Sequence, residues 1–371
     1  MQRTILLATF FSLACALLHL QAHRGGRASI FWGAVLCYGL AVFSKEHAIM
    51  LPAVMAGLSY WLHHNGSPWR WRWLPVFAGY AIFAALILWL RARGIQLGAL
   101  YEPLAQLYGF QPEHPHLTSI GAQTLLFFGY LGLWVLPDPR WMSIDIQLDL
   151  PAYVLPVWAA IGVAAFVGLL LLGVRWARCS GLRGLIGLTT LWACLLFGTE
   201  LWAVRLSETF VLYRSYLWMV LVPLALLAAV AGLISAPRRS STLLLVVALL
   251  ATGYGLVLRD RLASMSTPLR LWQDAVDKNA GVRWPGVWRA YSNLGTARAM
   301  DGDVETARKH FEQAVAVNPA GAYSAYCNLA NYYRLQGDFA RARHFVGQAA
   351  RIVPDASCIY QLARLGVIAQ P

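Results

Sequence analysis

Long apolar runs alternate with short polar segments over the first 258 positions of the chain. A helix needs about 20 apolar residues to cross a lipid bilayer, and six runs reach or approach that length. Because these runs contain almost no charged residues, we expect each of them to be a membrane-spanning helix. The six runs are Ile5–Ala22, Trp73–Ala92, Ala152–Val174, Gly184–Ala203, Ser215–Ile234 and Ser241–Leu258.

Two further apolar stretches need a different interpretation. Ser29–Leu62 is too long for one ordinary span, and the polar sequence Ser44–His47 interrupts it. Ionisable side chains in the middle of a bilayer are costly, so we expect two short helices with this polar sequence at their shared tip. Ser119–Pro137 is apolar enough to span but lies between two polar loops, and its path is left open.

From Thr267 onwards the pattern changes to amphipathic helices with a period of 3.6 residues. A set of positions recurs 35 residues later, with small residues at helix contacts, Gly-Asp turns and a proline after each second helix. Phe311 of the first copy has Val346 in its place in the second. The recurring positions are Tyr291, Leu294, Gly295, Gly302, Asp303, Ala307, Ala314 and Pro319, then Tyr326, Leu329, Ala330, Gly337, Asp338, Ala342, Ala349 and Pro354.

This pattern resembles the tetratricopeptide repeat over roughly Thr267–Gln370, with copies at about 288–321 and 323–356. We expect a degenerate earlier helix around Leu271–Ala275 and a closing helix at Ile359–Ile368. Stacked helix pairs of this kind present an extended binding surface. The resemblance therefore implies an array that binds an acceptor or a partner protein.

The composition agrees with a membrane protein, because 58% of the residues are hydrophobic and only 13% are charged. A soluble domain usually carries about 25% charged residues. The net charge of +13 raises the alternative of nucleic-acid binding. We reject that alternative because the basic residues fall in short loops between apolar runs, where cytoplasmic loops of membrane proteins collect Lys and Arg.

Four of the short loops are basic, and placing all four in the cytoplasm sets the orientation. The tip at Lys45, the loops Gly94–Thr118 and Asp138–Asp149, and everything after Arg259 are then outside. This arrangement requires that Ser119–Pro137 dips in or lies flat rather than crossing. We expect the inner membrane of a Gram-negative-type bacterium, with the repeats in the periplasm. The loops carry Arg24 and Arg27; Arg70 and Arg72; Arg175, Arg178 and Arg183; and Arg238 and Arg239.

The cysteines and histidines predict no metal site. The six cysteines form no CxxC pair and no cluster with histidine. His114 and His116 are spaced for metal binding, but no third ligand is suggested near them. Cys327 and Cys358 both fall in the repeat region, and we expect them to stay unpaired.

Cationic residues at the outer ends of the predicted spans are candidates for phosphate binding. Lys45 either binds the phosphate of a lipid-linked donor, oriented by Glu46, or pairs with Glu46 to cap two helix ends. Arg91 is a second candidate, because guanidinium groups bind phosphate through two hydrogen bonds; its alternative is snorkelling to headgroups. We expect Arg205 and Glu208 to pair at the rim of a loop and treat Arg214 as a possible ligand contact.

The order of parts resembles the GT-C superfamily of membrane glycosyltransferases, in particular the branch of transmembrane-and-tetratricopeptide protein O-mannosyltransferases. The resemblance implies a polyprenyl-phosphate-linked sugar as donor substrate, with no other cofactor and no metal, and implies that Lys45, Glu46, Arg91 and Arg214 hold its phosphate. The matching stretches are Leu40–Glu46, Met50–Pro52, Leu131–Asp149, Arg214–Trp218 and Leu271–Val276.

Two departures from the family pattern limit what the resemblance implies. Tyr213 stands where the family has a glutamate before the arginine, and no acidic residue precedes Glu46. The family places a catalytic carboxylate in an early outer loop, so we expect that an N-terminal catalytic part is missing or that the chain is inactive. A non-catalytic, membrane-anchored scaffold for protein–protein interaction is therefore the alternative function.

The sequence thus predicts an all-α protein with two parts. Residues 1–258 form a polytopic transmembrane helix bundle, and residues 259–371 form a tetratricopeptide-like repeat domain.

Overall fold

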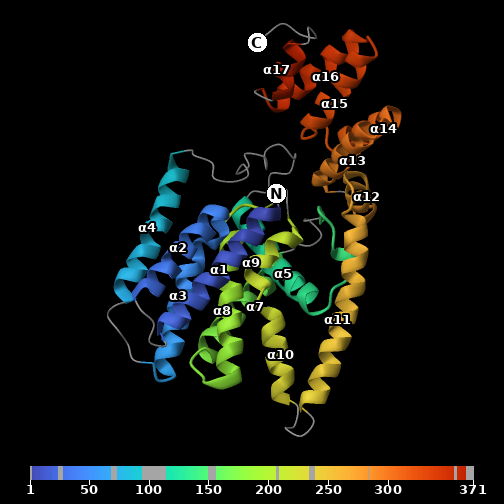
Figure 1. Ribbon diagram of the computed structural model, residues 1–371. Helices are drawn as coiled ribbons and strands as arrows, with labels where there is room; N and C mark the ends of the chain where they lie inside the picture. Colours follow the sequence, from blue (N-terminus) through green and yellow to red (C-terminus); the bar gives the residue numbers. More distant parts are fainter. Residues whose placement is uncertain are drawn as a thin grey trace.

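A computed structural model describes residues 2–23, 28–67, 73–93, 114–148, 156–205, 209–233, 239–282, 284–354 and 357–364. In this part of the chain the regular elements are helices, apart from one isolated antiparallel bridge between Ile146 and Phe210. The all-α prediction is therefore confirmed. Apolar helices form a bundle, and the C-terminal helices stand beyond one end of it (Figure 1).

The bundle consists of α1 (Gln2–His23), α2 (Ala28–Ser44), η1 (Glu46–Met50), α3 (Leu51–His64), α4 (Trp73–Ala92), α5 (Pro115–Val135), η3 (Pro139–Trp141), α7 (Pro156–Trp176), α8 (Gly181–Trp202), η4 (Leu212–Ser215), α9 (Tyr216–Met219), α10 (Val222–Leu233) and α11 (Arg239–Ser264). The C-terminal array consists of α12 (Pro268–Lys278), η6 (Pro285–Val287), α13 (Trp288–Met300), α14 (Val304–Val317), α15 (Tyr323–Leu335), α16 (Phe339–Ile352) and α17 (Ser357–Arg364).

Five of the described helices, α1, α5, α7, α8 and α11, are long and apolar enough to cross a membrane by length and composition. The segments Leu212–Met219 and Val222–Gly232 meet that test together and are bent by 54°. α2 and α4 are apolar but shorter. The α11 helix continues past residue 258 to Ser264. The domain boundary expected between residues 258 and 259 stays a prediction.

The stretch Ser29–Leu62 forms two short helices with the polar sequence between them, as predicted. α2 ends at Ser44, whose hydroxyl donates to the Leu40 carbonyl at 2.7 Å. A short 3₁₀ turn then places Glu46 and His47 at the tip, and α3 follows with Pro52 in its first turn. Proline fits there because the first backbone N–H groups of a helix have no partner within the helix.

The α5 helix packs along the segment between α8 and α9. The contacts between them explain why α5 carries polar side chains in an apolar sequence. Polar side chains on α5 satisfy the backbone of that segment at three places: Ser119 donates to the Ala203 carbonyl, Gln123 donates to the Thr209 carbonyl, and Tyr130 accepts from the Val211 amide. Near the end of α5, Trp134 donates to Ser215 at 2.8 Å. Irregular backbone needs such partners when it is buried among apolar helices.

The array contains two helix pairs, α13–α14 and α15–α16, joined by matching turns. Gly302 and Gly337 have φ values of 85° and 77°, a conformation that glycine adopts at little cost. The aspartate after each glycine caps the second helix, because its side chain accepts from the Thr306 amide in one pair and the Arg341 amide in the other.

Close contact within the first pair depends on the small residue Gly295. A Cβ atom on Gly295 would lie 2.6 Å from the Phe311 ring and 3.0 Å from the Ala307 carbonyl oxygen. In the second pair Ala330 is fully buried, and the smaller Val346 belongs to the same apolar cluster. Buried packing positions are Leu294, Ala307, Ala314, Tyr326, Leu329, Ala342 and Ala349; Tyr291 is half-buried, and the exposed Pro319 and Pro354 follow the ends of α14 and α16.

The expectation for Cys327 and Cys358 is wrong, because the two residues form a disulfide with their Cα atoms 6.0 Å apart. The bond links α15 to the first turn of α17, which packs against α15 and α16. The closing helix carries no repeat motif that would place Cys358 beside Cys327, so the repeat spacing does not predict this contact. Within the described residues this helix ends at Arg364; residues 365–368 of its predicted range lie outside them.

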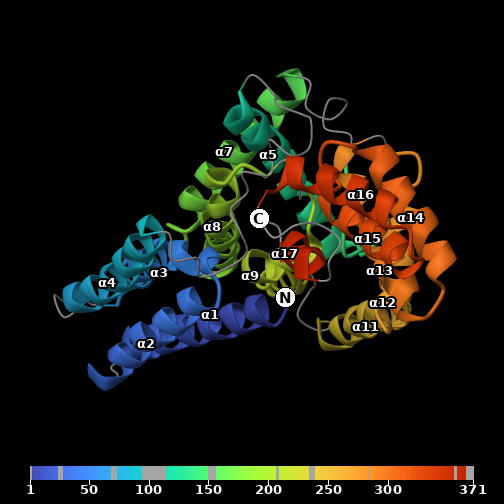
Figure 2. The same cartoon turned by 90° about the horizontal axis from the view of Figure 1, so that it is seen from above.

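Seen from above, the array lies over the side of the bundle that contains α5 and α11, whereas α2 and α4 extend away from it (Figure 2). α11 leads into α12 through a short turn, in which the Met265 amide donates to the Arg261 carbonyl. The tip between α2 and α3 lies near the end of the bundle that the array faces (Figure 1).

Candidate functional site

Two polar sites lie at the end of the bundle that faces the array. The first is centred on Glu200, in the last turn of α8. Its carboxylate accepts from His47 Nε2 at 2.7 Å and is 3.0 Å from Arg205 Nε and 3.6 Å from Arg214 Nη1. Glu200 is 2% exposed, and removing a charge so completely from water requires partners of this kind.

The tip residues complete this first site, which we call the Glu200 cluster. Lys45 Nζ lies 3.9 Å from a carboxylate oxygen of Glu46, and His47 Nδ1 lies at the same distance from that oxygen. Three permanent cations, Lys45, Arg205 and Arg214, thus share the site with two carboxylates. Among the described residues, this site therefore gathers several cations close together, and such a group attracts anions.

The Glu200 cluster contains three of the four residues that we expected to bind the donor phosphate. Lys45, Glu46 and Arg214 come together, although the tip and η4 are far apart in the sequence. Arg205 pairs with Glu200, whereas Glu208 lies outside the described residues, so the pairing of Arg205 with Glu208 stays a prediction. Arg91 is in the last turn of α4, and its side chain also lies outside the description.

Sequence reasoning missed the roles of Glu200 and His47. Glu200 was visible as a carboxylate at the end of an apolar run, and such residues are expensive unless paired. The sequence did not reveal its partners, because they lie 153 positions before it and 5 and 14 positions after it. Only the packing of α8 against η1 and α3 brings His47 to its carboxylate.

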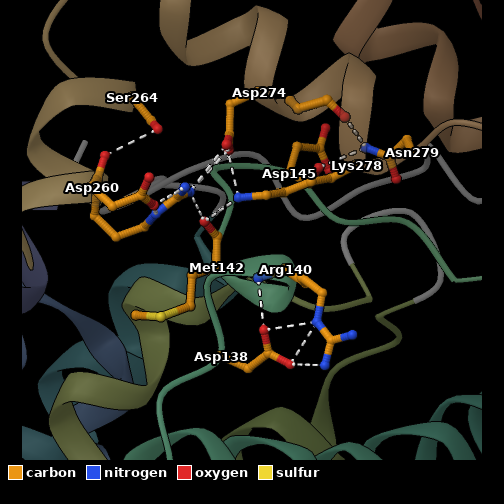
Figure 3. Close-up of polar contacts among 11 residues, drawn as sticks. Asp138, Arg140, Met142, Asp145, Asp260, Ser264, Asp274, Lys278 and Asn279 are labelled. Atoms are coloured by element: carbon orange, nitrogen blue, oxygen red, sulfur yellow. Dashed lines mark hydrogen bonds and ion pairs between the residues drawn. The ribbon is translucent and has the colours of Figure 1, made fainter. Parts of the chain in front are cut away.

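The second site joins the array to the bundle through residues 142–148, which we call the strut. The Met142 carbonyl accepts hydrogen bonds from Lys278, at 3.0 Å, and from Arg261. Both cations also pair with Asp274, at 2.7 Å and 3.1 Å (Figure 3). Burial raises the pKa of Asp274, but the hydrogen bond from Lys278 and the charges of Lys278 and Arg261 outweigh it and hold the pKa below its ordinary value.

Asn279 fixes the middle of the strut. Its side-chain amide donates to the Asp145 carbonyl at 2.8 Å, and its side-chain oxygen accepts from the Gln147 amide at 2.8 Å. The Asp145 carboxylate, 1% exposed as a residue, pairs with Arg289 of α13 at 3.0 Å. On its other side the strut pairs with Phe210 through Ile146, so it is held between bundle and array.

These contacts give structural roles to two carboxylates of the loop between Asp138 and Asp149. The Asp145 carboxylate accepts hydrogen bonds from Arg289 and Gln147 and so anchors the strut. Asp138 caps a short turn and pairs with the exposed Arg140. Asp149 lies outside the described residues.

A third polar cluster joins helices inside the bundle. His19 hydrogen-bonds Ser59 at 2.8 Å and Tyr80 at 3.1 Å, and His23 hydrogen-bonds Ser59 at 3.1 Å. Such side chains hold apolar helices together where no water is present. Among the described residues there is no group of three His, Cys, Asp or Glu side chains arranged to hold a metal ion, and His114 and His116 are exposed.

Comparison with known proteins identifies one part of the chain. Residues 289–355 match the tetratricopeptide repeat family, which covers both helix pairs from α13 to α16. No curated protein and no solved structure matches the chain. The repeat prediction is thereby confirmed, and repeats of this family typically bind protein partners.

Proposed function

We propose that this protein is embedded in a membrane and carries a tetratricopeptide array, and that the array binds a protein partner. The family match at 289–355 carries the proposal. A surface feature supports it: apolar side chains are exposed at equivalent positions of both copies, next to the turns. Met300 is 76% exposed and Leu335 is 65% exposed, while Val304 and Phe339 are 42% and 46% exposed. Repeated exposure of apolar side chains is typical of a binding edge.

The proposed orientation places the array outside the cytoplasm, in the periplasm of a bacterial cell. Two independent features support it. The connection between α7 and α8, which carries Arg175, Arg178 and Arg183 in and around it, lies on the side of the bundle away from the array (Figure 1). The array contains the Cys327–Cys358 disulfide, and disulfides persist in oxidising compartments.

Photo-crosslinking in living cells tests the proposed function. A photoreactive amino acid is placed at Met300 or Leu335 of the full chain, and at the exposed Gln313 of α14 as a control. We expect a discrete protein adduct from the two turn positions, lost when the other turn position is changed to aspartate. No adduct from either turn position, or equal adducts from Gln313, would contradict the proposal.

A second candidate function, favoured by the gathering of Lys45, Arg205 and Arg214 in the Glu200 cluster, is transfer of a sugar from a polyprenyl-phosphate donor. In this candidate Lys45 and Arg214, with Arg91, hold the donor phosphate, and Glu46 orients Lys45. Oriented cations would stabilise the phosphate as it leaves the sugar. The array would then hold the acceptor protein.

Binding and transfer are measured separately to test the second candidate. The full chain in lipid vesicles receives a labelled polyprenyl-phosphate sugar, with Lys45→Ala and the control Arg140→Ala, whose side chain is 86% exposed and lies outside the cluster. The candidate predicts weaker donor binding for Lys45→Ala and wild-type binding for Arg140→Ala. Equal donor binding by all three proteins removes it, whatever the result of the transfer assay.

A further inference from the structure

The second helices of the two repeat copies differ in the charge pattern of one face. On α14 this face contains Glu305, Arg308 and Glu312, and Arg308 lies 3.3 Å and 2.6 Å from the two carboxylates. Residues at these spacings are neighbours on one side of a helix. The equivalent residues on α16, 35 positions later, are Ala340, Arg343 and Gly347. Both carboxylates are thus replaced by small neutral residues, while the arginine remains.

One more exchange increases the contrast. Ala316, the next residue along this face of α14, is replaced by Arg351 on α16. Arg343 and Arg351 are exposed, and within the described part of the chain neither has an ion-pair partner. Eight residues of helix separate them, a distance of about 12 Å. At these four positions α14 has two acidic residues and one basic residue, whereas α16 has two basic residues and no acidic one.

Gly347 lies between the two arginines and is also exposed, and a Cβ atom built on it would have no neighbour within 4 Å. Glycine in a helix interior costs about 0.5–1 kcal/mol relative to alanine, so nothing in the packing of α16 favours it. Its absence of a side chain leaves the helix backbone open to a partner between the two charges. We call the surface of Arg343, Gly347 and Arg351 the α16 face.

The neighbouring cation is held differently and does not belong to this surface. Arg341 pairs with Asp338 at 2.5 Å and lies over the Tyr333 ring, 4.6 Å from its centroid. The α16 helix is at the end of the array opposite the bundle (Figure 1), so lipid headgroups around the bundle are out of reach. An anion that meets the α16 face therefore arrives from the aqueous compartment.

We propose that the α16 face binds an acidic segment of a protein partner, with carboxylates about 12 Å apart that meet Arg343 and Arg351. Arginine suits this contact because its guanidinium group binds a carboxylate through two parallel hydrogen bonds. The inference rests on the proposed role of the array in protein binding, and it names the chemistry of the partner. Partner carboxylates restore here the pairing that Glu305 and Glu312 provide within α14.

The test restores the acidic pattern of the first copy on the second. The full chain is placed in uncharged lipid nanodiscs, and binding of a labelled oligoglutamate peptide is measured at low and physiological salt. Ala340→Glu with Gly347→Glu keeps both arginines and adds internal partners, so we expect affinity to fall about tenfold. Arg343→Ala with Arg351→Ala should cause a similar loss.

Two control variants separate charge from folding and from general attraction. Gly347→Ala raises helix propensity without adding charge, so it should bind the peptide as the wild type does. Glu305→Ala, Glu312→Gly and Ala316→Arg give α14 the pattern of α16, and we expect a second peptide to bind. Unchanged affinity after the two glutamates are added to α16, or an equal loss with Gly347→Ala, would overturn the inference.

Failure of this inference can be distinguished from failure of the proposed function. If crosslinking at Met300 and Leu335 finds a protein partner while the α16 variants bind oligoglutamate normally, the inference about the α16 face is contradicted and the proposed function stands. If oligoglutamate binding depends on the α16 face as expected but no crosslinked protein is found, the proposed partner-binding role of the turn positions fails instead.

Discussion

The bundle and the array place their charged side chains in opposite ways. In the described part of the bundle, a buried group of polar side chains gathers around Glu200, whose carboxylate contacts His47, Arg205 and Arg214. In the array, the cores between helices combine small residues such as Ala307 with larger ones such as Phe311 and Leu329, and charges pair on the surface. The bundle therefore depends on a few strong polar contacts, while the array depends on close packing.

The first prediction concerns the strongest of these contacts. Glu200→Ala removes the carboxylate that accepts from His47 and faces two buried or half-buried arginines. Breaking a buried pair in this way costs about 3–5 kcal/mol. Thermal unfolding of the full chain in nanodiscs should show a large loss for Glu200→Ala. Arg140→Ala, which removes an ion pair made by an exposed arginine and keeps the Asp138 cap, should unfold like the wild type; equal losses for both variants would contradict the central role of Glu200.

The second prediction concerns the junction between the two regions. Asn279→Ala leaves the Asp145 carbonyl and the Gln147 amide without the partners that Asn279 supplied, and each buried group left unsatisfied costs about 1–3 kcal/mol. Hydrogen exchange in residues 142–148 and in α13 should become faster. The exposed Asn331 of α15 provides the matched control, since Asn331→Ala removes only a contact to Arg334. Unchanged exchange in the strut would show that Asn279 does not hold it.

The third prediction tests close packing in the array through the size exchange between the copies. Gly295→Ala should cost about 1–3 kcal/mol, because its Cβ atom would meet the Phe311 ring. Phe311→Val alone should cost a similar amount through the cavity it leaves. The double variant reproduces the Ala330–Val346 pair of the second copy, so we expect a coupling of about 0.5–3 kcal/mol in its favour. Local hydrogen exchange in α13 measures all three; strict additivity would contradict the packing account.

The fourth and smallest effect is the acid sensitivity of the strut. Because the folded pKa of Asp274 is lower than its unfolded value, its ion pairs stabilise the junction fully above the unfolded pKa of about 4. The contribution is lost as the pH falls through the folded pKa. Wild-type hydrogen exchange in 142–148 should therefore accelerate below about pH 4 relative to pH 7. Asp274→Asn should show a smaller acceleration; an identical pH profile would exclude Asp274 as the responsible group.

The array could be predicted from the sequence in more detail than the bundle, for a physical reason. Repeat register follows from spacing along the chain, so the Gly302 and Gly337 turns and the α13–α16 boundaries were visible as a pattern. The contacts of Glu200, Asp145 and Asn279 are between residues far apart in sequence. No local periodicity encodes them, and the Cys327–Cys358 disulfide was missed for the same reason.

The apolar bundle shows an intermediate case. Hydrophobic length predicted the long apolar helices and the break at Lys45, because both are local properties, but it did not predict the 54° bend within the expected span Ser215–Ile234. It did not predict that the α5 side chains Ser119, Gln123 and Tyr130 would serve the backbone between α8 and α9. Those residues appeared as isolated polar positions in an apolar run, and only tertiary packing gives them partners.

The side of the membrane on which the array stands decides between the proposed orientation and its reverse. A reporter that is active only outside the cytoplasm can be inserted at two places. One is after Gly66, which follows the C-terminal end of α3, and the other is after Met265, between α11 and α12. The account predicts activity at the second position and none at the first. Activity after Gly66 with none after Met265, or the same result at both positions, would contradict it.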